Sequence, residues 1–244
     1  MNSEQIDTAP LEPALYLFPV PLSSGPTDLV LPEHNIRLLR QVKHFIVENI
    51  RSARRFIKLC DRSIDINTLS FVELNRHTNP LDIPSMLDPL TAGEPMGVIS
   101  EAGCPAIADP GADVVALAQR KGLKVVPLVG PSSILMGLMG SGFNGQSFAF
   151  AGYLPIDRDA RNATLRTFRQ RIEREAQTQI FIETPYRNNK LIAELAEALP
   201  STLRLCVAAD ITGPTESIIT RPIADWRKAK YDYSKTPAIF LLYR

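Results

Sequence analysis

Residues 100–111 hold the densest group of chemically capable side chains in this 244-residue chain. They read Ser-Glu-Ala-Gly-Cys-Pro-Ala-Ile-Ala-Asp-Pro-Gly, so a hydroxyl, a thiol and carboxylates lie among glycines and prolines. Gly103 has no Cβ, and its backbone would therefore allow N–H and C=O groups to approach a ligand closely. This composition is equally typical of an ordinary turn between a strand and a helix. Residues elsewhere in the chain must decide between the two interpretations.

The surrounding sequence places this segment at the end of a buried strand. An apolar run over residues 96–99 precedes it, and a helical pattern begins at Ala112. Two further carboxylates, Glu48 and Glu183, also follow short apolar runs that we interpret as strands. Open α/β sheets bind ligands at the carboxyl ends of their strands. The pattern therefore predicts a ligand site with carboxylates around it.

Strand-like and helix-like segments alternate through the chain. This alternation predicts an α/β architecture with mostly parallel pairing in the first half. The expected strands span residues 14–21, 44–47, 69–74, 96–99, 123–128, 147–150, 180–183, 203–209, 218–220 and 238–243. The expected helices span residues 36–43, 52–60, 83–90, 113–120, 134–139, 161–176 and 189–199. We expect a flexible tail over residues 1–13, a first α/β domain over 14–128 and a second over 129–244.

Composition and charge limit the class of protein. Hydrophobic residues make up 45% and charged residues 22%, which is ordinary for a soluble globular protein. The formal net charge of +1 predicts no global attraction to nucleic acid. The three cysteines include no CxxC pair, which argues against a disulfide framework or a zinc site, and we expect no metal. The chain shows no secretory signal and no apolar run of bilayer length, so we expect a cytoplasmic protein without a membrane partner.

The segment over residues 98–111 resembles the Ser-Asp-Ala-Gly-Thr-Pro…Asp-Pro-Gly signature of the tetrapyrrole methylase superfamily, the class III methyltransferases. Further matches follow in order. Val-Gly-Pro-Ser-Ser at 129–133 continues the match, Ala-Gly-Tyr-Leu-Pro at 151–155 is similar to Gly-Phe-Leu-Pro, and 181–187 is similar to a Glu-Ser-Pro-His-Arg segment. The chain most resembles the ribosomal RNA (cytidine-2′-O-)methyltransferase branch.

The resemblance implies two α/β domains of the tetrapyrrole methylase type, with S-adenosylmethionine in the cleft between them. It implies methylation of a ribose 2′-hydroxyl, with ribosomal RNA or the small ribosomal subunit as partner, and a homodimer. The cofactor contacts that it assigns are Ser100, Glu101, Ala102, Gly103, Asp109, Ser132, Ser133, Leu154, Thr184, Pro237 and Ala238.

Methyl transfer from a sulfonium donor is a single in-line displacement, so the protein mainly aligns donor and acceptor. A ribose hydroxyl is a poor nucleophile that benefits from a base or from nearby cations. The candidate bases are Glu48, Glu101 and Glu183, and the nearby cations are Arg51 and Lys235. Glu101 is the first choice for a contact with the substrate or with the methionine end of the cofactor. Each of these residues fits a capping or salt-bridge role as well.

Two departures from the branch keep other functions open. Its Glu-Asp-Thr-Arg segment corresponds here to residues 48–51, in which Asn49 replaces the aspartate. Near the C-terminus, Lys235 is kept, but Pro237 and Ala238 resemble the tetrapyrrole enzymes. The alternatives are a methyltransferase for a small or tetrapyrrole-like molecule, and a diverged inactive domain that binds S-adenosylmethionine, its product or only a partner protein. A nucleotide-binding dehydrogenase is disfavoured, because no GxGxxG follows the first strand.

A group of basic residues also has two interpretations. Its members, Arg51, Arg54, Arg55, Lys58 and Arg62, fit a phosphate-facing stripe as well as a solvated helix face. The one aromatic residue among them, Phe56, falls with the apolar residues of the amphipathic pattern, so it offers no platform for base stacking.

Overall fold

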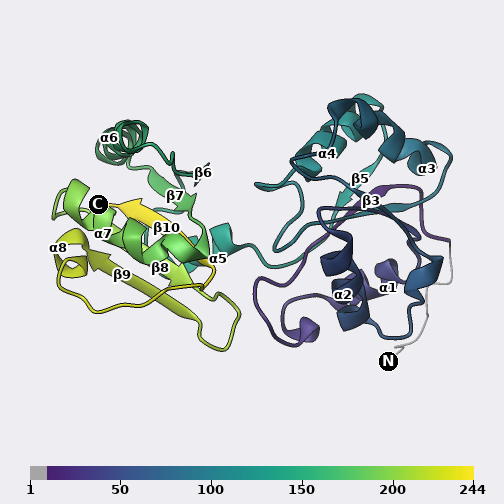
Figure 1. Ribbon diagram of the computed structural model, residues 1–244, viewed down its shortest axis with the longest axis horizontal. Helices are drawn as coiled ribbons and strands as arrows, with labels where there is room; N and C mark the ends of the chain where they lie inside the picture. Colours follow the sequence, from purple (N-terminus) through teal and green to yellow (C-terminus); the bar gives the residue numbers. More distant parts are fainter. Residues whose placement is uncertain (1–9) are drawn as a thin grey trace. The chain divides into compact units, whose positions relative to one another are not determined.

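Two five-stranded sheets organise the chain, each within its own unit (Figure 1). The computed structural model describes residues 10–244. Unit 1 contains the chain up to Pro21 and again from Pro26 to Pro131, and unit 2 contains Leu22–Gly25 and Ser132–Arg244. The predicted division after residue 128 did not include the short segment Leu22–Gly25. The tail expected over residues 1–13 falls mostly outside the described residues.

The sheet of unit 1 is entirely parallel, in the order β3-β2-β4-β1-β5. Its strands are short and mostly apolar, as expected for a parallel sheet that is covered on both faces. The strands are β1 Leu15–Phe18, β2 His44–Val47, β3 Ser70–Glu73, β4 Met96–Ile99 and β5 Val125–Pro127. The parallel pairing predicted for the first half of the chain is confirmed.

Helices cover the two faces of this sheet. Phe18 and Phe45 pack in one cluster with residues of α1 and α2, whereas Leu17 and Ile46 pack in another with α3 and α4. This alternation follows from the two-residue period of a strand. The helices are α1 Glu33–Leu39, α2 Ile50–Cys60, α3 Asp88–Thr91 and α4 Gly111–Arg120, with 3-10 turns η1 Thr27–Leu29, η2 Ile66–Thr68 and η3 Pro80–Leu87.

The sheet of unit 2 is mixed, in the order β6-β7-β10-β8-β9. Only the β6–β7 pair is parallel, and the other neighbours are antiparallel. The strands are β6 Phe148–Tyr153, β7 Thr178–Ile182, β8 Arg204–Ala209, β9 Ser217–Pro222 and β10 Ala238–Tyr243. The helices are α5 Ser133–Ser141, α6 Arg158–Glu175, α7 Asn188–Ala198 and α8 Ile223–Trp226, with the 3-10 turn η4 Pro185–Arg187.

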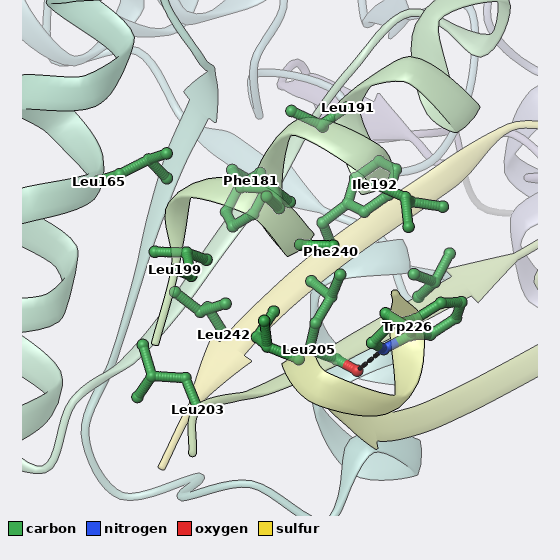
Figure 2. Close-up of a cluster of buried hydrophobic side chains, with 14 of the residues drawn as sticks. Leu165, Phe181, Leu191, Ile192, Leu199, Leu203, Leu205, Trp226, Phe240 and Leu242 are labelled. Atoms are coloured by element: carbon green, nitrogen blue, oxygen red, sulfur yellow. Dashed lines mark hydrogen bonds between the residues drawn. The ribbon is translucent and has the colours of Figure 1, made fainter. Parts of the chain in front are cut away.

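One face of this second sheet packs with α6, α7 and α8, and the other with α5. Figure 2 shows the larger cluster, in which Phe181 and Phe240 stack with ring centroids 5.8 Å apart. Trp226 lies at the edge of this cluster, and its indole Nε1 donates a hydrogen bond of 2.9 Å to the backbone oxygen of Leu205. The buried indole therefore has a polar partner, as a buried tryptophan requires.

Replacing Phe181 by alanine is expected to lower the free energy of unfolding by about 3–5 kcal/mol, because the buried ring leaves a cavity behind. Trp226 is the only tryptophan and belongs to the same cluster, so its fluorescence during urea denaturation measures the effect. The matched control is Phe148→Ala, since that ring is 39% exposed, and we expect it to cost less than half as much. Equal losses in both variants would contradict this account of the core.

The α/β class is confirmed, whereas several element bounds predicted from the sequence are wrong. The helix expected over 36–43 runs instead from Glu33 to Leu39, directly after Pro32. The helix expected from residue 161 begins at Arg158, because the Asp157 side chain accepts a hydrogen bond of 2.9 Å from a backbone N–H of the first turn. No helix within residues 10–244 combines the length and the apolar character needed to cross a membrane.

Candidate functional site

The carboxyl ends of β2 and β4 lie side by side in unit 1, because these strands pair in parallel. Glu48 follows β2, and its backbone N–H donates to the oxygen of Ile99 at 3.2 Å. The loop after β4 begins at Ser100, and the backbone N–H of Glu101 donates to Oε2 of Glu48 at 3.3 Å. The structure therefore brings the predicted catalytic residues Glu48 and Glu101 together at one edge of the sheet.

Gly103 fixes the path of the loop after β4. It is buried and lies in the left-handed region with a φ of 72°. Its N–H and its C=O exchange two hydrogen bonds of 2.9 Å with Val20, in the segment after β1. Ser100 and Ala102 lie on the same loop, the first buried and the second exposed. Glycine reaches this conformation without steric cost, so the residue type matches its local geometry.

Asp109 shapes the rest of this loop. Its Oδ1 accepts hydrogen bonds from the backbone N–H groups of Ala106 at 3.1 Å and Gly111 at 2.7 Å. Ala106 and Ala108 have φ values of 67° and 61°, so the loop contains two strained alanines. The second oxygen, Oδ2, is buried and has no hydrogen-bond partner among residues 10–244. One carboxylate oxygen thus holds the loop, and the other is unsatisfied.

Glu48, Ser100 and Asp109 line a small cavity of about 10 Å³, enough for about one water molecule. Burial raises the pKa of the Glu48 carboxyl above its ordinary value; the amide of Glu101 lowers it, and the charges of Asp109 and Glu101 raise it further. Burial also raises the pKa of Asp109, against the opposing effect of the loop amides. A carboxylate whose pKa is raised toward neutral pH is a better general base.

The first turn of α2 lies beside these carboxylates. The side-chain oxygen of Asn49 accepts a hydrogen bond of 3.1 Å from the backbone N–H of Ser52 and so caps the helix. Asparagine and aspartate cap helices about equally well, so the replacement noted in the sequence preserves this local fold. Ser52 also donates from its hydroxyl to Oε2 of Glu101 at 3.1 Å. Arg51, a predicted catalytic cation, is exposed on the same turn.

In unit 2, the predicted cofactor residues Leu154, Thr184, Pro237 and Ala238 gather at one edge of the sheet. Leu154 follows β6, Thr184 follows β7, and these two strands run parallel. β10 runs antiparallel to β7 and starts at this edge with Ala238, so Pro237 lies there as well.

Lys235 lies in the turn before β10 and is held there by its backbone. Its φ of 62° is left-handed, and its N–H donates to the oxygen of Pro185 at 3.1 Å. The buried side chain of Asn188 donates to the oxygen of Thr236 at 2.7 Å and fixes the same turn. The Lys235 side chain is exposed at the edge that carries Thr184.

Three other predicted residues of unit 2 have local structural roles. The hydroxyl of Ser132 caps α5 by accepting from a backbone N–H of the first turn at 3.5 Å, and Ser133 is the first residue of that helix. Glu183 is buried; one of its oxygens accepts from the next backbone N–H at 2.7 Å, and the other lies 3.3 Å from Nη2 of Arg187. Glu183 therefore fits a capping and salt-bridge role better than the role of a catalytic base.

Asp210 is a polar residue of this edge that the sequence reasoning missed. It follows β8, and its backbone N–H donates to the oxygen of Pro237 at 2.9 Å. Its carboxylate accepts hydrogen bonds from Ser23 and Thr215, which lower its pKa below the ordinary value. An aspartate directly after a predicted strand was the sequence feature that could have pointed to it. Its partner Ser23, however, lies 187 positions away in the sequence. Within the described part of the chain, no cluster of three or more His, Cys, Asp or Glu side chains could hold a metal ion.

Comparison with solved structures shows the fold. The chain matches the methyltransferase CobJ with a TM-score of 0.62 at 13% identity, over 95% of this chain and 94% of that one. It matches the uroporphyrin-III C-methyl transferase from Thermus thermophilus, complexed with S-adenosyl homocysteine, with a TM-score of 0.54 at 18% identity, over 95% and 97% of the two chains. The fold is that of the tetrapyrrole methylase class, as the sequence resemblance implied.

Comparison with curated proteins shows the family. The chain is 30% identical over 229 residues to the ribosomal RNA small subunit methyltransferase I of Mesorhizobium japonicum, covering 92% of this chain and 74% of the relative. It is 29% identical over 213 residues to the protein of that name from Vibrio cholerae, covering 87% and 70%. No protein-family model matches the sequence. The chain belongs to the ribosomal RNA small subunit methyltransferase I family.

Proposed function

We propose that the protein transfers the methyl group of S-adenosylmethionine to a ribose 2′-hydroxyl of ribosomal RNA in the small subunit. The observation that carries this proposal is the polar edge of unit 1, where Glu48 and Glu101 meet the glycine loop of a chain that belongs to this family. We further propose that it acts in the cytoplasm and as a homodimer. These last two points rest on the family resemblance and on the ribosomal substrate.

The residues of unit 1 fit the proposed cofactor. Both backbone groups of Gly103, which were expected to approach a ligand, are bonded to Val20 instead, so this left-handed glycine sets the path of the loop that would hold the cofactor. The buried, unsatisfied Oδ2 of Asp109 leaves polar capacity beside Ser100 that a bound polar group or water satisfies. Ser100, Glu101, Ala102 and Gly103 would hold the cofactor from this loop. When bound, S-adenosylmethionine supplies an activated methyl group.

The other cofactor contacts stay predictions for unit 2. They are Ser132, Ser133, Leu154, Thr184, Pro237 and Ala238. A solved structure of this fold holds S-adenosyl homocysteine, which supports a cofactor of this type.

The chain's own residues would supply the proton chemistry. We assign the role of general base to Glu48, because burial raises its pKa and its carboxylate lies at the open end of a strand. Glu101 would contact the substrate or the methionine end of the cofactor, held in place by the hydroxyl of Ser52. Arg51 is an exposed cation near these carboxylates that would stabilise the alkoxide as the hydroxyl loses its proton, and a catalytic role for Lys235 stays a prediction for unit 2.

Transfer of a labelled methyl group tests the proposal. The purified protein is incubated with methyl-labelled S-adenosylmethionine and small ribosomal subunits from a strain that lacks this methylation. We expect label in the RNA, at a nucleoside that resists alkaline cleavage because its 2′-oxygen is methylated. Label only in a porphyrin-type acceptor that is offered in parallel would favour the tetrapyrrole alternative. No transfer to any acceptor would favour an inactive binding domain.

A further inference from the structure

A basic groove runs along α2, outside the polar edge of unit 1. The α2 groove has a volume of about 720 Å³, and the lining residues that matter here are Arg51, Arg54, Arg55, Lys58, Ile66 and Glu73. We propose that the α2 groove binds the sugar-phosphate backbone of the RNA substrate. This inference rests on the proposed function and adds to it the surface that holds the RNA.

Helical spacing puts the four cations on one side of α2. Residues at positions i, i+3, i+4 and i+7 share a helix face. The four cations have this spacing, over about 10 Å of helix, at Arg51, Arg54, Arg55 and Lys58. The opposite face is buried in the core of unit 1 through Ala53, Phe56 and Ile57. The cations are therefore displayed outward by a helix whose other side is fixed.

The charges of this face are not neutralised. Arg51, Arg54 and Arg55 form no salt bridge with any residue in the range 10–244 that the structure describes. Lys58 donates to the backbone oxygens of Arg62 and Ile64, which orients its ammonium group but leaves its charge in place.

The carboxylate of the groove is already engaged. Oε1 of Glu73 accepts a hydrogen bond of 3.1 Å from the backbone N–H of Ile50. Four cations and this one carboxylate leave a local excess of three positive charges, in a chain whose net charge is only +1. Such an excess attracts a polyanion locally, although the whole protein does not.

The aromatic residue of this region supports a cation and offers no platform for bases. The guanidinium of Arg54 lies 5.3 Å from the ring centroid of Phe71, and Phe71 also stacks with Phe45, at 5.7 Å between centroids. Phe71 is only partly exposed. Contacts with phosphates position RNA without reading its sequence, so the groove matches the backbone and not the bases.

The α2 groove leads to the proposed catalytic residues. Its lining includes Asn49, the N-cap of the helix, and Arg51 of the first turn; Glu48 directly precedes the cap, and Ser52 follows Arg51. Ser52 in turn binds Glu101. RNA held along the helix would therefore reach the carboxylates at its N-terminal end.

A second basic groove, between α6 and α7 of unit 2, serves as a comparison. It has a volume of about 840 Å³. Several of its cations are paired, since Arg161 lies 2.8 Å and Lys190 3.9 Å from Glu194, and Arg169 lies 2.6 Å from Glu173. Cations that are neutralised within the protein have less to gain from phosphate, so the α2 groove is favoured.

The double variant Arg54→Gln/Arg55→Gln tests the α2 groove. Its binding to small-subunit RNA is measured by filter retention between about 50 and 200 mM salt. We expect affinity at least about tenfold weaker at the lower salt, and a salt slope reduced by about 1.4 for two lost phosphate contacts on single-stranded RNA. The control Arg158→Gln/Arg166→Gln removes the same charge from the groove between α6 and α7 and should leave both values unchanged.

Kinetics separate this inference from the proposed function. Methyl transfer by the Arg54→Gln/Arg55→Gln variant should show a raised KM for RNA with an unchanged kcat, and its affinity for S-adenosylhomocysteine should equal that of the wild type. If the wild type methylates RNA and this variant binds RNA as tightly as the control does, the α2 groove does not bind the RNA and the proposed function stands. If the wild type transfers no methyl group to RNA, the proposed function itself fails.

Discussion

Gly103→Val should lose at least about 100-fold in affinity for S-adenosylmethionine and S-adenosylhomocysteine, which corresponds to about 2.7 kcal/mol. The reason is the proposed contact between the cofactor and the loop after β4. Gly103 has a left-handed φ of 72°, and both of its backbone groups are bonded to Val20. A β-branched side chain strains this conformation and would displace the loop that we propose to hold the cofactor. Calorimetric titration with both ligands measures the loss.

The backbone strain alone should cost stability, by about 1–3 kcal/mol, so the experiment needs a variant with the same strain elsewhere. Gly122→Val supplies it, because Gly122 has a φ of 67° after α4, and no atom lies within 4 Å of the position that a Cβ would take there. We expect both variants to unfold at lower urea concentration and only Gly103→Val to lose the cofactor. Undiminished affinity in Gly103→Val would place the cofactor away from this loop.

Glu48→Gln should lower kcat for RNA methylation by about 100-fold or more, within the range of general base catalysis. Glutamine keeps the shape of the side chain and can still accept the hydrogen bond from the backbone of Glu101. It has no basic oxygen to take the proton of the ribose hydroxyl. Affinity for S-adenosylhomocysteine should therefore change little, and single-turnover kinetics at saturating RNA measure the remaining rate.

The pH profile adds a test that a purely structural role would not pass. A base must be deprotonated, and burial raises the pKa of Glu48 above its ordinary value. The rate of the wild type should therefore fall as the pH drops through this raised pKa, and Glu48→Gln should lack that limb. The matched control is Glu94→Gln, since Glu94 is exposed before the start of β4, at the opposite end of the strand. A normal kcat in Glu48→Gln would remove Glu48 as the base and return that role to Glu101.

Much of the fold could be predicted from the sequence, because local patterns determine it. Strands β2, β4 and β10 match apolar runs of the expected lengths, and a serine before α5 caps that helix as expected. The four-residue helix α8 was missed, since Ile223–Trp226 is too short to show a helical period. Its position follows from the burial of Trp226 in the core, which no local pattern reveals.

The candidate site was predictable to the level of strand ends and no further. Parallel pairing of β2 with β4 brings Glu48 close to Glu101, as expected from their positions at the carboxyl ends of two predicted strands. The carboxylate of Asp109 was expected to contact the cofactor, yet one of its oxygens holds the loop through Ala106 and Gly111. Hydrogen bonds of this kind depend on the path of the backbone. Sequence spacing alone cannot separate such a loop-holding aspartate from a ligand contact.

The segment Leu22–Gly25 also bears on how the chain folds as it leaves the ribosome. This segment belongs to unit 2, and Ser23 binds Asp210, which is made 187 residues later. At about 5–20 residues per second, about 10–40 seconds of synthesis separate the two partners. Unit 2 therefore cannot be completed while the nascent chain first emerges, and the segment must wait until all of unit 1 and most of unit 2 have been made. A fragment that begins at Ser132 would lack this segment altogether, so dissecting the protein requires the segment to be supplied with unit 2.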